Sequence, residues 1–133
     1  MQSKIIRFLF YFIPPVIWMS VIYYFSSHTR TQLAEDQILN FLIFKSFHVI
    51  EYAILFFLIF RSSYFFKKNK FILSYRFILV FFITLLYAIS DEFHQTLVPT
   101  REGIPRDVLI DLIGMIVMYT GIKIKFKLIK KFL

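Results

Sequence analysis

The chain has 133 residues, of which 59% are apolar and 21% aromatic, and its mean hydropathy is +0.69. Soluble domains are usually about 45–50% apolar, so this chain has too little polar surface to cover a water-facing globule. Its composition therefore argues against a soluble monomer and excludes intrinsic disorder. There is no cysteine, which excludes disulfides, thiolate metal sites and cysteine nucleophiles. The length fits one domain over residues 1–133.

The charge is strongly basic, with sixteen Lys and Arg against eight Asp and Glu and a net charge of +8. In so apolar a chain, we expect the positive excess to face anionic lipid headgroups rather than nucleic acid. Membrane lipids are therefore the predicted partners. Nothing in the sequence indicates whether the chain pairs with itself.

Four apolar stretches follow one another, over residues 8–25, 47–60, 77–90 and 108–124. The first has 18 residues without a charge, which at about 1.5 Å per residue crosses most of a bilayer core of roughly 30 Å. The others reach that length only if the polar residues at their ends are helical. None alternates with the period of two that marks membrane strands. The sequence therefore predicts an all-α, polytopic bundle of four transmembrane helices, roughly residues 5–26, 45–62, 72–95 and 106–125.

The first helix follows Lys4 and Arg7, as the apolar region of a signal peptide would. Its apolar run is longer than in ordinary signal peptides, and large aromatic residues at 23–25 stand where small residues should precede cleavage. We therefore expect a retained helix. Pro14 and Pro15 lie inside it, so either the helix kinks there or the residues before them form a separate interfacial turn.

The charges of the connections orient the predicted bundle. The N-terminal region, the loop at 61–76 and the C-terminal region hold twelve basic residues and no acid: Lys4, Arg7, Arg61, Lys67, Lys68, Lys70, Arg76, Lys123, Lys125, Lys127, Lys130 and Lys131. Residues 26–51 and 91–111 hold the remaining basic residues, Arg30, Lys45, Arg101 and Arg106. The same two regions hold all eight acids: Glu35, Asp36, Glu51, Asp91, Glu92, Glu102, Asp107 and Asp111. The positive-inside rule then places both termini in the cytoplasm and the acid-bearing connections outside.

Polar side chains are costly in membrane helices, and here they gather at the predicted outer ends. His48 and Glu51 are three apart on the second helix and therefore share a face. On the third helix, Gln95 is three or four residues from both Glu92 and Asp91 and neighbours each of them. These spacings predict two polar faces at the same level of the bundle.

A third polar face opens the fourth helix, where Asp107, Asp111 and Gly114 recur at i, i+4 and i+7. Arg101 follows Pro99 in the loop before it. Because the second and fourth helices run inward and the third runs outward, we expect all these groups to converge. The predicted site consists of His48, Glu51, Asp91, Glu92, Gln95, Arg101, Asp107 and Asp111.

Several carboxylates crowded in a low dielectric must share protons, pair with arginine or hold a cation. A divalent cation is one candidate ligand, and its predicted donors are Glu51, Asp91, Glu92, Asp111 and His48. Arg101 suits a phosphate or carboxylate of a ligand. His48 or Glu92 suits general acid or base chemistry near neutral pH.

The alternative is a structural network without chemistry. In that interpretation His48, Arg101 and Arg106 pair with the carboxylates, Asp107 caps the fourth helix and Gly114 allows close helix packing. A network that combines histidines, several acids, an amide and an arginine more often binds or transforms something polar, which favours a functional site.

The sequence resembles the VanZ-like family in four ordered motifs: Lys45-x-x-His48-x-x-x-Tyr52-x-x-Leu55, Tyr87-x-x-x-Asp91-Glu92-x-x-Gln95, Pro99-x-Arg101 and Asp107-x-x-x-Asp111-x-x-Gly114. It departs from the family at Thr100, where glycine is common, and at Asp111, where many members have asparagine. The resemblance implies a small multi-pass protein of the bacterial cytoplasmic membrane. It also implies a link to glycopeptide resistance, because the founding member is associated with low-level resistance to teicoplanin.

Four functions remain open at this stage. The leading one is binding, or modification, of an amphipathic cell-envelope molecule at the outer face, such as a lipid-linked wall precursor or a glycopeptide. The second is a membrane hydrolase or transferase that uses a cation held by carboxylates. The third, a proton or ion pathway, is weakened by the apolar inner halves of the third and fourth helices. The fourth is a structural subunit of a membrane complex.

Overall fold

The computed structural model describes residues 2–28, 33, 35–66, 73–99, 101 and 103–129, and its regular elements within these ranges are all helical. They are α1 (Gln2–Ser26), α2 (Gln37–Ser62), η1 (Ser63–Phe65), α3 (Leu73–Gln95), α4 (Pro105–Ile124) and α5 (Phe126–Ile129). The predicted all-α fold is confirmed. Residues named in the sequence analysis that lie outside the described ranges are Arg30, Lys67, Lys68, Lys70, Thr100, Glu102, Lys130 and Lys131.

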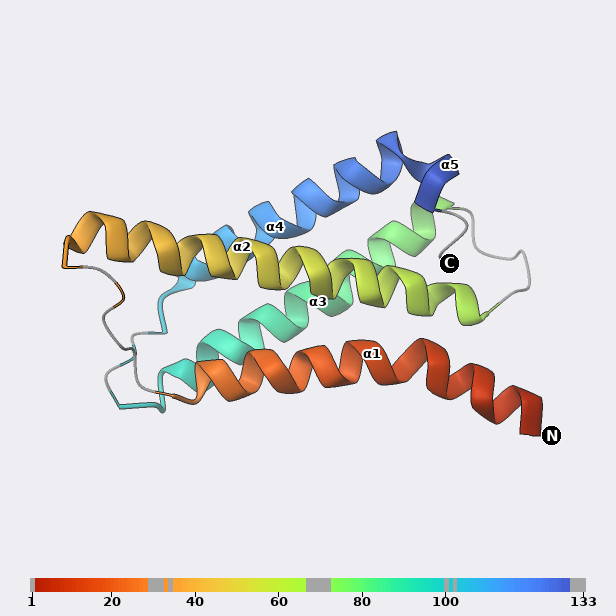
Figure 1. The fold of residues 1–133 in the computed structure, drawn as a ribbon, viewed down its shortest axis with the longest axis horizontal. Helices are drawn as coiled ribbons and strands as arrows, with labels where there is room; N and C mark the ends of the chain where they lie inside the picture. Colours follow the sequence, from red (N-terminus) through yellow and green to blue (C-terminus); the bar gives the residue numbers. More distant parts are fainter. Residues whose placement is uncertain are drawn as a thin grey trace.

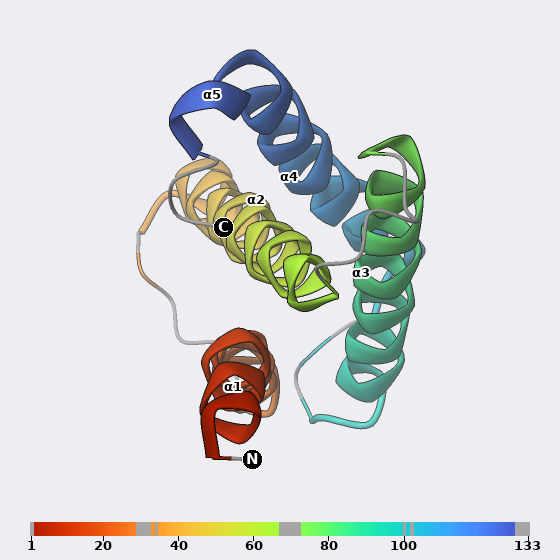
Figure 2. The same ribbon diagram turned by 90° about the vertical axis from the view of Figure 1, so that its right-hand side faces the viewer.

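The four long helices lie side by side, and α1 and α3 run opposite to α2 and α4 (Figure 1). Viewed along the bundle, α2 lies in the middle and packs against the other three (Figure 2). Its inward side chains Tyr52, Leu55, Phe56 and Phe60 are fully buried, whereas others such as Ile38 and Ile50 are exposed. The start of α1 and the end of α4 lie at one end of the bundle, and the predicted polar site lies at the other.

Helix α2 begins at Gln37, about two turns before the predicted start at residue 45. Asp36 explains the difference, because its side chain accepts a hydrogen bond from the Leu39 N–H at 2.8 Å and so caps the helix. His48 consequently lies about three turns inside α2 rather than in its first turns. Helix α1 is continuous through its two prolines, which excludes a separate interfacial turn before them.

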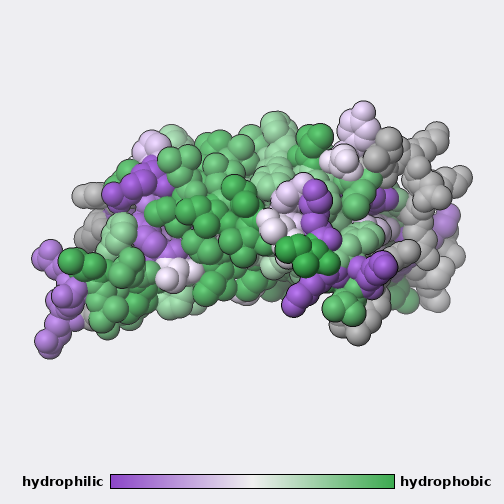
Figure 3. Space-filling view, turned by 90° about the horizontal axis from the view of Figure 1, so that it is seen from above, coloured by the Kyte–Doolittle hydropathy of each residue, from purple (hydrophilic) through white to green (hydrophobic). Residues whose placement is uncertain are grey.

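Three helical stretches are long and apolar enough to cross a membrane: Lys4–Ser26, Gln37–Phe65 and Leu73–Gln95. Helix α4 has 20 residues and is long enough, but it carries Arg106, Asp107, Asp111 and Lys123. It is therefore too highly charged to count as a fourth such stretch. On the face that Figure 3 shows, apolar side chains cover the middle, with hydrophilic patches on either side of it. Such a band is typical of a helix bundle in lipid. The structure therefore supports three of the four predicted spans.

Gly114 sets the close approach of α4 to α2. A Cβ atom at this position would lie 2.2 Å from the carbonyl oxygen of Val49 and 3.1 Å from the backbone nitrogen of Ala53. Small residues allow membrane helices to pack backbone against backbone. The close packing predicted at Gly114 is therefore confirmed, and it holds α4 against the central helix.

We predict that Gly114→Ala lowers the free energy of unfolding by about 1–3 kcal/mol, because the added methyl group collides with backbone atoms. Gly121→Ala is the matched control, since nothing lies within 4 Å of its Cβ position. That change should leave stability unaltered or raise it by up to about 1 kcal/mol through helix propensity. Thermal unfolding in detergent micelles, followed by circular dichroism, measures both; equal stability of the two variants contradicts the prediction.

Candidate functional site

Two buried polar pairs join α2 to α4. The Lys45 ammonium forms an ion pair with Asp107 Oδ2, and His48 Nδ1 lies 3.0 Å from Asp111 Oδ1. The two aspartate side chains are at most 1% exposed. Lys45 and His48 are three residues apart on α2, and their partners Asp107 and Asp111 are four residues apart on α4. Both pairs can form together because the two helices run in the same direction. We call this double contact the α2–α4 ladder.

A second group of carboxylates, at the end of α3, is held by neutral donors. Gln95 Nε2 donates to Asp91 Oδ2 at 3.1 Å and to Glu92 Oε1 at 3.3 Å. Tyr52 OH donates to Asp91 Oδ2 at 3.5 Å, and the Ile104 N–H donates to Glu92 Oε2 at 3.1 Å. Both acids and Gln95 are buried. The Gln95 amide thus contacts both Asp91 and Glu92, as the spacing predicts, and orients both carboxylates.

Arg101 ties the loop between α3 and α4 to the end of α1. Its guanidinium donates to the carbonyl oxygens of Phe25 at 2.6 Å and His28 at 2.8 Å, and to Gln95 Oε1 at 3.4 Å. The last carbonyls of a helix have no helical donor and carry partial negative charge, so an arginine suits them. The structure therefore gives Arg101 an anchoring role that its predicted role as a ligand clamp did not include.

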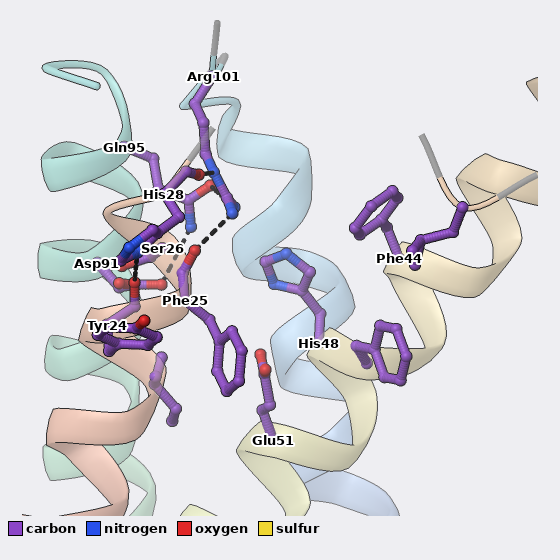
Figure 4. Close-up of a pocket in the computed structure, with 13 residues that line it drawn as sticks. Tyr24, Phe25, Ser26, His28, Phe44, His48, Glu51, Asp91, Gln95 and Arg101 are labelled. Atoms are coloured by element: carbon purple, nitrogen blue, oxygen red, sulfur yellow. Dashed lines mark hydrogen bonds between the residues drawn. The ribbon is translucent and has the colours of Figure 1, made fainter. Parts of the chain in front are cut away.

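A pocket of about 580 Å³ opens beside these groups, between α1, α2 and α3 (Figure 4). Its polar lining includes His48 and Glu51 of α2, which face Asp91 and Gln95 of α3. The rest of its lining is mainly apolar and aromatic: Ile22, Tyr24, Phe25, Leu33, Phe44 and Phe47. The pocket is therefore amphipathic.

Glu51 stands out among the polar residues of this pocket. Its half-buried carboxylate makes no hydrogen bond or ion pair with any described side chain or backbone group, although it lines the cavity. In Figure 4 it points into the space between α1 and α2. Its acceptor oxygens are therefore available to a ligand.

The eight predicted residues lie at one end of the bundle but on two sides of it. Five of them line the pocket: His48, Glu51, Asp91, Gln95 and Arg101. The other three, Glu92, Asp107 and Asp111, are buried toward α4 and do not line it. His48 belongs to both sides, because it lines the pocket and contacts Asp111.

Two contacts differ from the structural network considered from the sequence. Asp107 does not cap α4, because the helix begins after Ile104 and the aspartate side chain turns to Lys45. Arg106 is exposed and pairs with Asp107, its Nε 3.8 Å from Asp107 Oδ1. Arg101 donates to the backbone carbonyls of Phe25 and His28. The predicted pairings of His48 and Arg106 with a carboxylate are present, and so is the predicted close helix packing at Gly114.

Several site residues escaped the sequence analysis. The role of Lys45 was readable in principle, because it precedes His48 by three residues and therefore shares its face. The contribution of α1 through Tyr24 and Phe25 carried no such signal, since aromatic residues of a first membrane helix equally suit lipid contact.

The family model VanZ/LLP1 matches residues 8–126. The chain belongs to the VanZ/LLP1 family. No curated protein and no solved structure matches it. The matched range contains most of α1, all of α2, α3 and α4, and all eight predicted site residues. Membership of the VanZ/LLP1 family and the three apolar helices together indicate a membrane protein.

We predict that Lys45→Met and Asp107→Leu each destabilise the protein by about 3–5 kcal/mol, because each leaves a buried charge without its main partner. The double variant should recover most of that loss. Lys123→Met, at an exposed lysine of α4, is the control and should change stability by less than about 0.5 kcal/mol. Unfolding in detergent measures the free energy of unfolding of the parent, the two single variants and the double variant. If the losses of the two single variants simply add in the double variant, the ladder makes no net contribution.

Proposed function

We propose that this protein binds an amphipathic cell-envelope molecule in the pocket between α1, α2 and α3. The observation that supports this most strongly is that one pocket combines an aromatic lining with a carboxylate, Glu51, that has no partner among the described residues. An apolar part of a ligand contacts Phe25, Phe44 and Phe47. Its polar head contacts His48 and Glu51.

The chemistry of the polar side selects a head rich in hydrogen-bond donors. Glu51 and Asp91 are acceptors when ionised, and three contacts already occupy the Arg101 guanidinium. Sugar hydroxyls, amides and amines therefore suit this side better than a bare anion. A volume of about 580 Å³ falls in the usual range for small-molecule sites, roughly 300–1,000 Å³.

A lipid-linked wall precursor or a lipoglycopeptide combines such a head with an apolar part. Glycopeptides such as teicoplanin carry sugars and amides, and the resemblance to the VanZ-like family favours a link to resistance against them. We place the protein in the bacterial cytoplasmic membrane, where both kinds of ligand occur at the outer leaflet.

We further propose that α4 is a fourth span and that both termini are cytoplasmic. Arg7 and Arg61 lie at the end of the bundle opposite the pocket, as do Lys123 and Lys125. The positive-inside rule assigns that end to the cytoplasm. The pocket then faces the outer leaflet, and the two buried aspartates of α4 face α2 rather than lipid.

We predict that Glu51→Gln weakens ligand binding about tenfold or more, because it removes the charge that strengthens hydrogen bonds from the head. The measurement is binding of labelled teicoplanin, and separately of a lipid-linked disaccharide precursor, to the protein in nanodiscs. Asp36→Asn is the control: it also removes an acid but keeps a good helix cap outside the pocket. Equal binding of either ligand by the parent and Glu51→Gln contradicts a role for this pocket in binding it.

The absence of native cysteine allows a clean test of topology. We predict that Glu35→Cys reacts with a membrane-impermeant maleimide in intact cells, whereas Lys125→Cys reacts only after lysis. Both positions are exposed in the structure, so burial does not account for a difference. The reverse pattern, or labelling of both in intact cells, contradicts the proposed orientation.

A further inference from the structure

A compact set of possible metal ligands lies behind the pocket. His48 of α2, Glu92 of α3 and Asp111 of α4 each offer one ligand atom, and these atoms lie within 4.8 Å of one another. All three residues are buried. The sequence had suggested a wider set that included Glu51 and Asp91, and neither belongs to this group of three. We call it the His48–Glu92–Asp111 triad.

Asp111 contributes a buried oxygen that has no partner among the described residues. Asp111 is fully buried, and while its Oδ1 contacts His48, its Oδ2 accepts no hydrogen bond from the part of the chain that the structure describes. Beside the triad, Asp91 Oδ1 is likewise buried and has no partner within these ranges. A buried carboxylate oxygen without a donor is costly, because it has lost its water and gained nothing in return. These oxygens therefore favour a cation or a donor that the described residues do not supply.

The ion pairs around these carboxylates also favour a bound cation. Within the described residues, Asp91, Glu92 and Asp111 form no ion pair with a lysine or an arginine. The Lys45 ammonium is paired with Asp107. The Arg101 guanidinium donates hydrogen bonds to Phe25, His28 and Gln95. Among the described residues, the buried carboxylates of this cluster thus outnumber the basic side chains that pair with them. A doubly charged ion would neutralise two of these carboxylates in their ionised form.

We propose that the His48–Glu92–Asp111 triad binds a divalent first-row transition cation of the Zn²⁺ or Mn²⁺ type. Ligand atoms no more than 4.8 Å apart reach metal distances of about 2.0–2.2 Å with shifts of about 0.7 Å or less. The imidazole favours these ions over Mg²⁺ or Ca²⁺, which prefer oxygen ligands alone.

The cation site does not depend on the identity of the pocket's ligand. His48 connects the two, because it lines the pocket and belongs to the triad. A cation held there adds positive charge at the polar wall of the pocket. Metal binding is therefore measurable on the protein alone, without teicoplanin or a wall precursor, and either proposal can fail while the other stands.

The test uses full-length protein in nanodiscs, stripped with a chelator and then dialysed separately against Zn²⁺, Mn²⁺, Mg²⁺ or Ca²⁺. We expect about one bound Zn²⁺ or Mn²⁺ per chain by elemental analysis, with a higher unfolding temperature, and no comparable effect of Mg²⁺ or Ca²⁺. X-ray absorption of the zinc-loaded protein should show one imidazole and otherwise oxygen ligands. Absence of stoichiometric Zn²⁺ and Mn²⁺, or a shell without imidazole, overturns the proposal.

Three variants locate the site: His48→Gln, Glu92→Gln and Asp111→Asn. Each should weaken binding by about 100-fold or more, since even outer-shell changes cost about 10–100-fold. Asp36→Asn, the same change outside the triad, should bind as the parent does. Circular dichroism and monodispersity identify variants that fold, and one folded variant suffices. Parent-like affinity in any folded triad variant overturns the assignment of that residue as a ligand.

Discussion

The α2–α4 ladder is the constraint on which the rest of this structure depends. Two ionisable pairs lie in the interior of an apolar bundle, where an unpaired charge is far more costly than at a wet surface. Sliding α4 by one turn, about 5.4 Å, along α2 would separate Lys45 from Asp107 and His48 from Asp111. Gly114 adds a steric limit one turn further along, because no side chain fits against Val49 there.

The ladder also determines what α3 and α1 can contribute. With α4 fixed, Glu92 of α3 comes to lie near both His48 and Asp111, and the loop that follows reaches back to Glu92 through the Ile104 N–H. Helix α1 is attached differently, by side chains that donate to backbone carbonyls. Trp18 Nε1 donates to the Glu51 carbonyl at 2.9 Å, and Tyr87 OH donates to the Met19 carbonyl at 2.6 Å. The polar lining of the pocket thus comes mainly from α2, α3 and Arg101, and its apolar lining is shared between α1, Leu33 and α2.

Much of this arrangement was predictable because membrane helices make polar residues conspicuous. The spacing of Asp91, Glu92 and Gln95 predicted one connected face, and their hydrogen bonds confirm it. The i, i+4, i+7 stripe on α4 likewise predicted a single contact face, which meets α2. Four apolar stretches were enough to predict the helices, although α4 carries too much charge to be recognised as a span by composition alone.

Other features depend on contacts that spacing does not encode. The early start of α2 follows from a local cap at Asp36, which the interruption of the apolar stretch concealed. Arg101 looked like a ligand clamp because its targets, backbone carbonyls at the end of α1, leave no mark in the sequence. The division between a pocket lined by Glu51 and a triad centred on Asp111 is also tertiary, since both residues belong to the same polar level of the bundle.

The most direct test of the account is the distance between the His48 ring and the Asp111 carboxylate in lipid bilayers. Rotational-echo solid-state NMR, on protein with ¹⁵N-labelled histidine and ¹³C-labelled aspartate carboxylates, measures it, and His48→Gln identifies the signal. The account predicts a nitrogen-to-carbon distance of about 4 Å or less that disappears in this variant. Dephasing that is absent in the parent, or unchanged by His48→Gln, would show that α2 and α4 do not meet at this pair.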